Sequence, residues 1–407
     1  MHILFLAQIC PYPPTSGGAI KSWNILRHLA SKHEVRLLTF TRKESENESI
    51  DYLRNLCASV EACRITREGL DAGFAARSVL GGKSFIISRD HRPEMQALIR
   101  RNLELPTNLI YVDHLQMFQY VQNPPPCAVL LDEHNVEWQI IRRMTRTGVS
   151  IPQRLFAVQE WPKLRRYELD ACGKADKVLT VTESDKRMLG ENGIGVNKLS
   201  VIPIGVDTEY FQPVSLIPTS RRILTFGTMS WPPNADSVIY FADSIYPLVK
   251  KRAPDVRFII AGANPPQRIR NLAAQDPSIE VTGFVEDIRD LAPDTAAFVV
   301  PLRAGSGMRV KILDAMAMGL PVVTTSIGCE GIDLQHGKHA LVTDKPEDFA
   351  RAVIRLMDNP DERFALASAG RRLVEDRYSW PPILSRLDVV IEELMGDERH
   401  VGFPEPP

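Results

Sequence analysis

The chain has 407 residues, of which 44% are hydrophobic and 24% are charged. This composition is typical of a soluble globular protein, and the length exceeds what one hydrophobic core usually supports, so we expect two domains. A formal net charge of −1 at pH 7 excludes the bulk attraction that draws basic proteins to nucleic acid, and we predict no nucleic-acid partner.

The first apolar segment and the cysteines favour a cytoplasmic protein. The apolar run at the N-terminus is short, is followed by prolines and lacks a basic flank, so we interpret it as a strand and not as a signal peptide. No apolar run in the sequence reaches the roughly 18 residues that span a bilayer. The six cysteines include no C-x-x-C pair, which indicates reduced thiols.

Short β-rich runs alternate with helical stretches along the whole chain. Several runs are continuous in Val, Ile, Leu and Phe, as expected of parallel strands that are covered on both faces. The alternation in two blocks predicts an α/β protein with two doubly wound, Rossmann-like domains that face each other across a cleft. The predicted strands are 2–7, 35–40, 108–113, 128–133, 177–182, 223–227, 256–262, 279–284, 297–302, 321–325 and 340–343.

A segment rich in Pro, Ser and Thr, residues 201–222, separates the two blocks. A long loop inside one domain is the alternative interpretation of this segment. The last stretch with helical spacing, residues 379–396, follows the second block, and we expect it to pack back across the first. The resulting division of the chain is 1–205, 206–376 and 377–407.

The first of two glycine-rich turns follows the first predicted strand, where Gly17 and Gly18 open a helix. Glycine lets a backbone approach a ligand closely, and the free N–H groups at a helix start favour an anion. A plain strand–helix turn would have the same sequence features, so this motif alone is weak.

The second turn lies in the sequence GSGMRVKILDAMAMGLPVV, which starts at residue 305. Ser306 is the expected N-cap of a helix that runs from about Gly307 to Met318 and ends at a Gly-Leu-Pro sequence. The N–H groups of Gly307 and Met308 would then form an anion-binding nest.

Three charged side chains follow this turn. Lys311 and Asp314 lie on one face of the predicted helix, and Arg309 extends forward from its first turn. Cations beside a phosphate, and a carboxylate that accepts from ribose hydroxyls, would together form a site for a nucleoside diphosphate. The alternative is a solvated helix edge with an ion pair.

Residues 223–345 closely resemble the donor-binding domain of retaining GT-B glycosyltransferases of family 4, also called the group 1 class. The resemblance rests on VIPIGVDTEYF, RFIIAGANPP, IEVTGFVEDIRDL, ILDAMAMGLPVVTT and YSWPPILSRL, which occur in the family's order. In the first half it is looser and rests on the Gly17-Gly18 turn, LLDEHNVEW and ADKVLTVTESD.

The resemblance implies that the first domain binds an acceptor and the second a nucleotide sugar, with the terminal helix crossing back to the first domain. It also implies a set of donor-binding residues from both domains. These are Gly17, Gly18, Gly227, Gly283, Phe284, Ser306, Gly307, Met308 and Asp314.

The chain departs from the family at the Glu-x7-Glu motif, whose two carboxylates bind the donor sugar and its ribose. Asp314 stands at the second position, but Ser306 stands at the first. The sugar contacts of the family are therefore in doubt here, although a serine hydroxyl and the adjacent amides can still bond to a sugar.

A second departure concerns the diphosphate. Where the family carries an Arg and a Lys after the first strand of this domain, this chain has Met229 and Asn234. We expect Arg309 and Lys311 to replace those lost cations and to stabilise the leaving diphosphate as catalytic residues.

His134, in LLDEHNVEW, aligns with the family's histidine near the reacting centre, and we assign it a catalytic role. Asp113 and His114 end the preceding strand and are candidates for acceptor binding. A structural histidine is the alternative for His134, because most lone histidines contribute only to packing.

The resemblance implies retaining transfer of a hexose-type sugar from a nucleoside-diphosphate sugar to a glycan or lipid-linked acceptor, in polysaccharide or glycolipid assembly. We find no D-x-D sequence near a predicted strand end, so we expect no metal and no cofactor beyond the donor substrate. Cations interleaved with apolar residues between 139 and 170 are candidates for peripheral contact with the inner membrane surface, unless they form an ordinary solvated helix face.

Two other functions stay open on the same architecture. A nucleotide-sugar epimerase would need acid–base residues crowded around the sugar, and a non-catalytic partner subunit would keep the fold without the chemistry. A dehydrogenase is disfavoured, because no predicted strand is followed by G-x-G-x-x-G with an acidic residue about 20 positions later.

Overall fold

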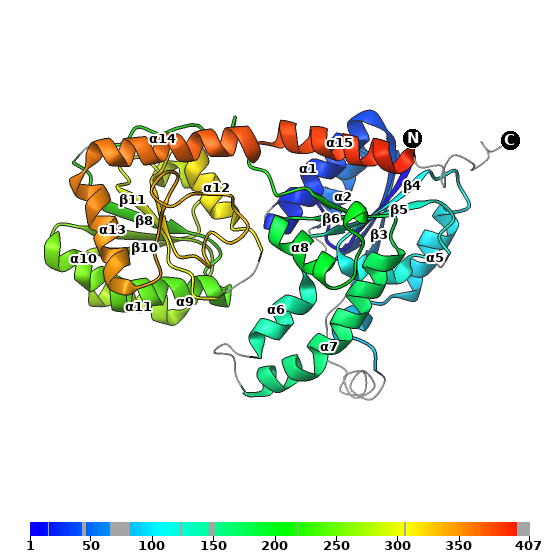
Figure 1. The fold of residues 1–407 in the computed structure, drawn as a ribbon, viewed down its shortest axis with the longest axis horizontal. Coiled ribbons are helices and arrows are strands. Elements are labelled where there is room, and N and C mark those ends of the chain that lie inside the picture. The colour runs from blue at the N-terminus through cyan, green and yellow to red at the C-terminus, as the bar shows by residue number, and fades with distance from the viewer. Residues whose placement is uncertain are drawn as a thin grey trace. The chain divides into compact units, whose positions relative to one another are not determined.

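The contacts of the computed structural model divide the chain into two compact units. Unit 1 comprises residues 1–204 and those from 384 on, and unit 2 comprises residues 205–383. Figure 1 shows a β-sheet with helices around it in each unit. The described residues are 1–14, 16–42, 46–65, 82–122, 124–145, 151–217, 219–304 and 307–396.

Unit 1 contains a seven-stranded, all-parallel sheet with the order β3-β2-β1-β4-β5-β6-β7. Its strands are β1 (His2–Ala7), β2 (Glu34–Thr41), β3 (Ser59–Arg64), β4 (Leu109–Asp113), β5 (Ala128–Glu133), β6 (Lys177–Thr180) and β7 (Leu199–Val201). Its helices are α1 (Gly17–Lys32), α2 (Asn47–Arg54), α4 (Phe85–Ser88), α5 (Pro93–Asn102), α6 (Glu137–Met144), α7 (Ile151–Lys174) and α8 (Glu183–Glu191), with 3₁₀ turns η2 (Leu115–Tyr120) and η3 (Val196–Lys198).

Unit 2 contains a six-stranded parallel sheet with the order β10-β9-β8-β11-β12-β13. Its strands are β8 (Arg222–Phe226), β9 (Arg257–Ala261), β10 (Ile279–Gly283), β11 (Ala297–Val300), β12 (Val322–Thr324) and β13 (Leu341–Val342). Its helices are α9 (Pro232–Tyr240), the π-helix η4 (Phe241–Ile245), α10 (Tyr246–Arg252), α11 (Gln267–Gln275), α12 (Val310–Ala317), α13 (Pro346–Asp358) and α14 (Pro360–Arg377), with a 3₁₀ turn η5 (Ile288–Leu291).

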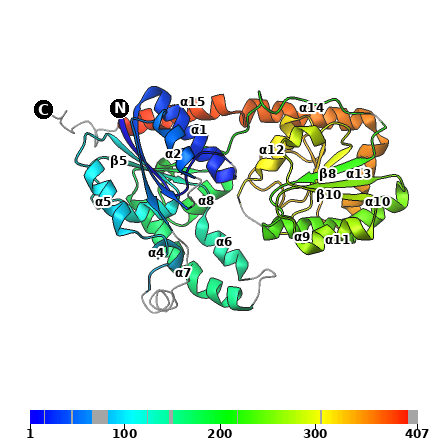
Figure 2. The ribbon, with the colours of Figure 1, turned by 180° about the vertical axis from the view of Figure 1, so that it is seen from behind.

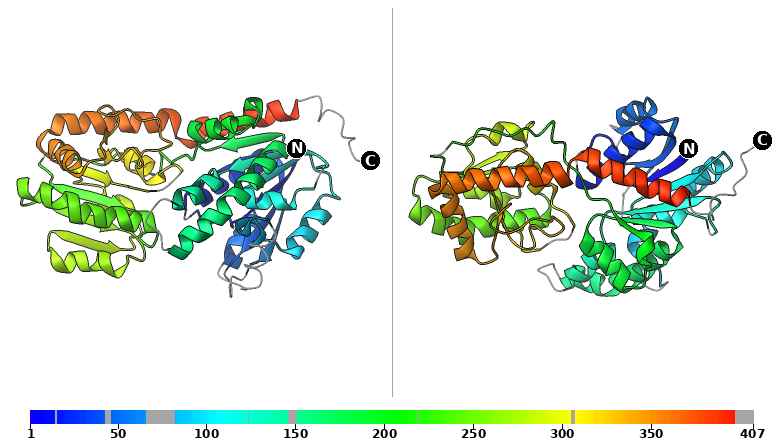
Figure 3. Two further views of the ribbon diagram at one scale, coloured as in Figure 1. Left: turned by 60° about the horizontal axis from the view of Figure 1, so that its bottom comes forward. Right: turned by 45° about the horizontal axis from the view of Figure 1, so that its top comes forward.

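The predicted α/β class with two Rossmann-like sheets is confirmed, and its physical basis is burial of the central strands on both faces. Every residue of β4, β5 and β11 is buried, which is possible for a parallel strand only when helices cover both sides of the sheet. In unit 2, α12 and α14 lie on one side of the sheet and α9, α10 and α11 on the other (Figure 3).

All eleven predicted strands are present, but two further strands were not predicted. β3 is an edge strand whose outward positions are polar, so it lacks the apolar run that marked the others. β7 has only three residues and lies inside the segment that we interpreted as the domain boundary. Edge strands need only one covered side, and their sequence signal is correspondingly weak.

The last helix, α15 (Trp380–Met395), begins in unit 2 and belongs to unit 1 from residue 384 on. Within unit 1 it packs along α1, as Figure 2 shows. Asp388 of α15 lies 2.8 Å from His28 Nε2 and accepts a hydrogen bond from Lys32 Nζ at 2.7 Å, and both partners are on α1. These ion pairs attach the end of the chain to the first helix.

Three neighbouring strands of unit 2 end in glycines with positive φ. Gly227 follows β8, Gly262 follows β9, and Gly283 ends β10, with φ angles of 149°, 152° and 72°. The Gly262 N–H donates to Gly283 O at 2.7 Å, and a Cβ at Gly262 would lie 1.8 Å from Gly227 O. Only glycine allows the chains to approach this closely at the edge of the sheet.

We predict that Gly262→Ala destabilises the protein by more than about 2 kcal/mol, because the new methyl group meets backbone and the φ is unfavourable. Gly337→Ala is the matched control, since its φ is also positive but nothing lies within 4 Å of the added Cβ. Thermal unfolding by calorimetry compares the two variants, and equal losses would contradict the close approach of the two strand ends.

Candidate functional site

In each sheet the strand order reverses at one point, between β1 and β4 in unit 1 and between β8 and β11 in unit 2. Ligands of open α/β sheets bind at the carboxyl ends of the strands beside such a reversal. In unit 2 these ends lead into Gly227 and the approach to α12, and in unit 1 into the start of α1 and Asp113. The candidate site residues of each unit lie at these two edges.

In unit 2 the side chains of Lys311 and Asn234 meet beside the end of β8. Lys311 Nζ donates to Asn234 Oδ1 at 2.8 Å, and Asn234 Nδ2 donates to Thr228 O at 3.0 Å. A Cβ at Gly227 would lie 3.3 Å from Lys311 Nζ. The ammonium group of α12 therefore lies against the asparagine of the neighbouring loop.

The start of α12 differs from the prediction. The helix begins at Val310 with Arg309 as its N-cap residue, so Gly307 and Met308 precede it and the expected helix start near Gly307 is wrong. Gly307 has a φ of 75°, which ends any regular helix there, and Arg309 Nη1 donates to Gly307 O at 2.6 Å. Ser306 lies outside the described residues.

Burial shifts the pKa of both ionisable side chains on α12. Desolvation, with a smaller contribution from the positive charge of Arg309, lowers the pKa of Lys311 to about 7. Desolvation raises the pKa of Asp314 to about 8. Each charge would be stabilised by a ligand of the opposite kind, an anion at Lys311 and hydrogen-bond donors at Asp314.

The other predicted donor residues of unit 2 lie at the same edge of the sheet. Gly283 ends β10, and Phe284, which follows it, is 76% exposed. Met308 is buried, and it precedes α12 by two residues. An aromatic ring this exposed at a strand end is available for contact with a ligand.

In unit 1 a buried carboxylate, Asp113, lies between two imidazoles. Asp113 Oδ2 is 2.9 Å from His114 Nδ1, and Asp113 Oδ1 is 2.9 Å from His134 Nε2. The two rings are stacked, with centroids 3.8 Å apart. Ser22 Oγ also donates to Asp113 Oδ2 at 2.8 Å. The structure thus brings together the three residues predicted in this domain.

A second buried carboxylate extends the cluster, and sequence reasoning missed it. Asp132 forms an ion pair with Lys21, and both side chains are fully buried. Tyr111 donates its hydroxyl to Asp132 Oδ2 at 2.7 Å. The available signal was the register of the sheet, because Asp113 of β4 and Asp132 of β5 are directly paired.

Gly18 of α1 borders both imidazoles. A Cβ at this position would lie 3.2 Å from His114 Nε2 and 3.5 Å from His134 Nδ1. The N-cap of α1 is Ser16, whose hydroxyl accepts from Ala19 N at 3.4 Å. The predicted Gly17-Gly18 turn and the predicted histidines therefore form one site.

The charges around Asp113 determine its protonation. Burial alone would raise the pKa of Asp113, but the adjacent imidazoles of His114 and His134 lower it below the usual range. Burial lowers the pKa of His134, and His114 adds to this effect. At His114 desolvation also acts to lower the pKa, but the charge of Asp113 outweighs it, so the pKa of His114 is raised.

Asp113, His114 and His134 could also hold a metal ion, since one ligand atom from each lies within 4.8 Å of the others. Two features of the site oppose a cation. The carboxylate oxygens of Asp113 already accept hydrogen bonds from both imidazoles and from Ser22. The start of α1, whose dipole favours anions, lies beside the rings.

The predicted basic stretch between residues 139 and 170 lies on α6 and α7, which pack side by side. Arg142 lies over Trp138 and Trp161, and Arg165 lies over Trp138, with distances of 5.4–5.9 Å to the ring centroids. These cations are held by the unit's own aromatic rings, and Arg146 lies outside the described residues. The exposed apolar residues are Ile151, Leu155, Phe156 and Val158 of α7.

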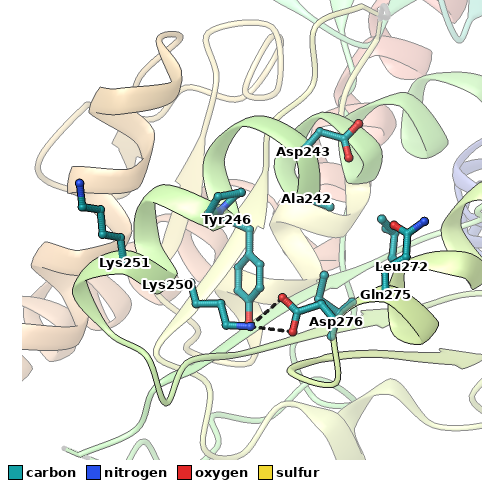
Figure 4. Close-up of a pocket in the computed structure, with 10 residues that line it drawn as sticks. Ala242, Asp243, Tyr246, Lys250, Lys251, Leu272, Gln275 and Asp276 are labelled. Atoms are coloured by element: carbon teal, nitrogen blue, oxygen red, sulfur yellow. Dashed lines mark hydrogen bonds and ion pairs between the residues drawn. The ribbon is translucent and has the colours of Figure 1, made fainter.

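A hollow of about 370 Å³ lies between α10 and α11, shown in Figure 4. Its polar groups are already paired, since Lys250 Nζ donates to both oxygens of Asp276 at 2.7 and 2.8 Å. It adjoins the residues that precede β9 and β10, which is the amino edge of the sheet. This hollow therefore lies at the edge opposite to Lys311 and does not carry the site.

Two family models match the chain, one over each half. The model described as Glycosyltransferase Family 4 matches residues 16–210, and the model described as Glycosyl transferases group 1 matches residues 220–359. The chain belongs to the group 1, or family 4, glycosyltransferases.

Several relatives of this glycosyltransferase are known by name. A 44.6 kDa protein in the cps region of Klebsiella pneumoniae is 23% identical over 95% of this chain and 98% of that protein. A GDP-mannose-dependent α-(1-6)-phosphatidylinositol monomannoside mannosyltransferase of Mycobacterium tuberculosis is 25% identical over 57% of this chain and 65% of the enzyme. For one component of the Arabidopsis thaliana phosphatidylinositol N-acetylglucosaminyltransferase the values are 23%, 54% and 50%. The chain thus matches half to two thirds of the length of these two proteins.

Solved structures support the same fold. Anabaena HepE in complex with UDP superposes with a TM-score of 0.68 at 13% identity, covering 97% of this chain and all of HepE. Sucrose-phosphate synthase of Thermosynechococcus elongatus gives a TM-score of 0.69 at 15% identity, covering 97% and 99%. The glycosyltransferase has the GT-B fold. Among its described helices, none combines the length and apolar character that crossing a membrane requires.

The raised pKa of Asp314 predicts a pH-dependent effect of Asp314→Asn. The folded wild type holds a proton on Asp314 up to about pH 8, whereas the unfolded chain loses it near pH 4. The stability that this proton contributes is complete below about pH 4 and is lost as the pH rises through about 8. The variant titrates no carboxyl here, so we expect it to gain stability relative to wild type between about pH 5 and 9.

Urea unfolding at several pH values measures this gain, and Asp290→Asn, at an exposed position, is the control. Lys311→Met should behave oppositely. Because burial lowers the pKa of Lys311 to about 7, the wild type gains stability relative to this variant from about pH 7 to 10. A pH-independent difference for both α12 variants would contradict the burial of the two charges.

Proposed function

We propose that the protein is a retaining glycosyltransferase that transfers a hexose-type sugar from a nucleoside-diphosphate sugar to a glycan or lipid-linked acceptor. The observation that carries the proposal is the contact of Lys311 with Asn234 at the end of β8. It places a cation of α12 beside the loop position where related enzymes carry a lysine. The diphosphate-binding charge is thus supplied by a different element.

The donor site on unit 2 combines three contributions. Lys311 and Arg309 bind the diphosphate, and Asp314, which lies one turn after Lys311 on α12, accepts from the ribose hydroxyls. Gly227 and Gly283 let the backbone approach the nucleotide, and Phe284 contacts it. The solved HepE complexes with UDP and with UDP-glucose support a nucleotide-sugar donor.

The acceptor is proposed from the relatives. The named enzymes transfer mannose or N-acetylglucosamine to phosphatidylinositol-based molecules, and another relative lies in a cps region. This supports work in glycolipid or cell-surface polysaccharide assembly. The exposed apolar residues Ile151, Leu155 and Val158 of α7 are the candidates for a peripheral contact with the inner membrane surface, from the cytoplasmic side.

Departure of the diphosphate needs charge stabilisation more than a strong base, because the donor already carries a good leaving group. Cations and helix starts that are oriented before the reaction stabilise the developing negative charge. The transition state resembles the oxocarbenium ion of glycoside cleavage. His134 of unit 1 contacts the sugar, and the acceptor attacks on the face from which the diphosphate leaves, without a metal ion or a further cofactor.

The Arg309→Ala/Lys311→Ala double variant tests the proposed phosphate site. Calorimetry with UDP, GDP, ADP and dTDP, in the presence of EDTA, should show one tightly bound nucleotide for wild type. The double variant should bind it about 100-fold more weakly, because two charge-assisted contacts are lost. Lys338→Ala/Lys345→Ala, which removes two exposed lysines, is the control and should bind like wild type.

Transfer is then measured with the sugar of the preferred nucleotide, and the anomeric configuration of the product is determined by NMR. A retained configuration supports the proposed mechanism, and an inverted one contradicts it. Binding of none of the four nucleotides would favour a non-catalytic partner subunit, and binding only after addition of a divalent metal would contradict metal independence.

A further inference from the structure

The two imidazoles beside Asp113 expose different nitrogens to the same point, the start of α1. His114 uses Nδ1 for Asp113, so its Nε2 faces Gly18. His134 uses Nε2 for Asp113, so its Nδ1 faces Gly18, and this buried Nδ1 has no hydrogen-bond partner within the described part of the chain. A buried polar atom without a partner is costly, and here it is aimed at a helix start.

The charge balance of the cluster allows one imidazolium. Lys21 and Asp132 neutralise each other as a buried ion pair, which leaves the negative charge of Asp113. Glu137 is the further acidic group that acts on His114. Two positively charged rings with centroids 3.8 Å apart would repel strongly, and a single carboxylate lies between them. One proton on the pair satisfies Asp113 and avoids this repulsion.

We propose that His114 is the imidazolium of this pair and donates from Nε2 to a phosphate oxygen at the start of α1, while neutral His134 accepts a substrate hydroxyl at Nδ1. This inference rests on the proposed glycosyltransferase function and divides its unit 1 site into two roles. The phosphate belongs either to the departing nucleoside diphosphate or to a lipid-linked acceptor.

The local structure supports this assignment. The side chain of His134 is 4% exposed and that of His114 is 11% exposed, so the charged form costs more at His134. The pKa of His114 is raised by Asp113 against the effect of desolvation, whereas burial lowers the pKa of His134. His114 also has φ 76° and ψ 142°, a conformation that costs a non-glycine residue about 1–3 kcal/mol and that brings its ring against His134.

The hydrogen-bond acceptor on Asp113 fixes both tautomers. Because the pKa of Asp113 lies below its usual range, this carboxylate can only accept, and the nitrogens that contact it carry the protons. A neutral His134 therefore has a bare Nδ1, which accepts a hydroxyl. A charged His114 has a second N–H at Nε2, which joins the N–H groups of the α1 start in binding an anion.

The protonation states can be read directly from the full-length protein labelled with ¹⁵N-histidine, at about pH 7. Long-range ¹H–¹⁵N spectra should show both nitrogens of His114 protonated and His134 neutral with a bare Nδ1. Signals are assigned with His114→Gln and His134→Gln. Two neutral rings, or a charged His134, would overturn the proposal, and neither result depends on any transfer activity.

The ligand is tested by adding UDP in one experiment and farnesyl phosphate in another. A shift of the His114 Nε2 signal with UDP assigns the phosphate to the donor, and a shift with farnesyl phosphate assigns it to a lipid-linked acceptor. A signal that neither anion shifts overturns the proposal. Failure of the Arg309 and Lys311 site would abolish nucleotide binding but would leave the histidine protonation states unchanged.

Two matched variants separate ligand contact from folding. Gly18→Ala places a methyl group 3.2 Å from His114 Nε2, and we expect affinity for the shifting anion to fall about tenfold. Gly173→Ala in α7, where nothing lies within 4 Å of the added Cβ, should bind like wild type. His114→Asn keeps a donor toward Asp113 but removes Nε2, and it should lose the same affinity while thermal unfolding stays near wild type.

Discussion

The structure depends on parallel strands that are buried on both faces. Such strands have no room for polar side chains along their length, so polar groups gather where the strands end. In unit 1, β4 ends in Asp113 and β5 runs through Asp132 to its end at Glu133, and in unit 2, β8 ends beside Gly227. Both candidate sites follow from this constraint, because the reversal of strand order opens space at the same edge.

The two sites solve the problem of buried charge differently. In unit 1 both carboxylates of the site have partners, since Asp113 and Asp132 share the contacts of two imidazoles, a lysine and a tyrosine. In unit 2 Lys311 bonds only to a neutral amide in the described structure, and its pKa falls to about 7. A paired cluster is stable as it stands, whereas an under-compensated cation is stabilised by an incoming anion.

The relation to other glycosyltransferases of the family shows how a function can be kept while its residues move. The loop after β8 carries Met229, which is buried, and Asn234, which contacts Lys311. The helix after β11 supplies the cation instead. Because both elements lie beside the reversal of strand order, a charge can pass from one to the other and still reach nearly the same point in space.

The sequence by itself determined the α/β class, eleven of the strands and most residues of both candidate sites, because apolar runs and glycine turns are local signals. It did not reveal the edge strands β3 and β7, or that α12 begins at Val310. Only the tertiary structure decided which polar groups meet. Asp113 faces Asp132 through the register of β4 and β5, and Lys311 reaches Asn234 from a position 77 residues away. Strand register and helix packing are long-range interactions, and no local pattern encodes them.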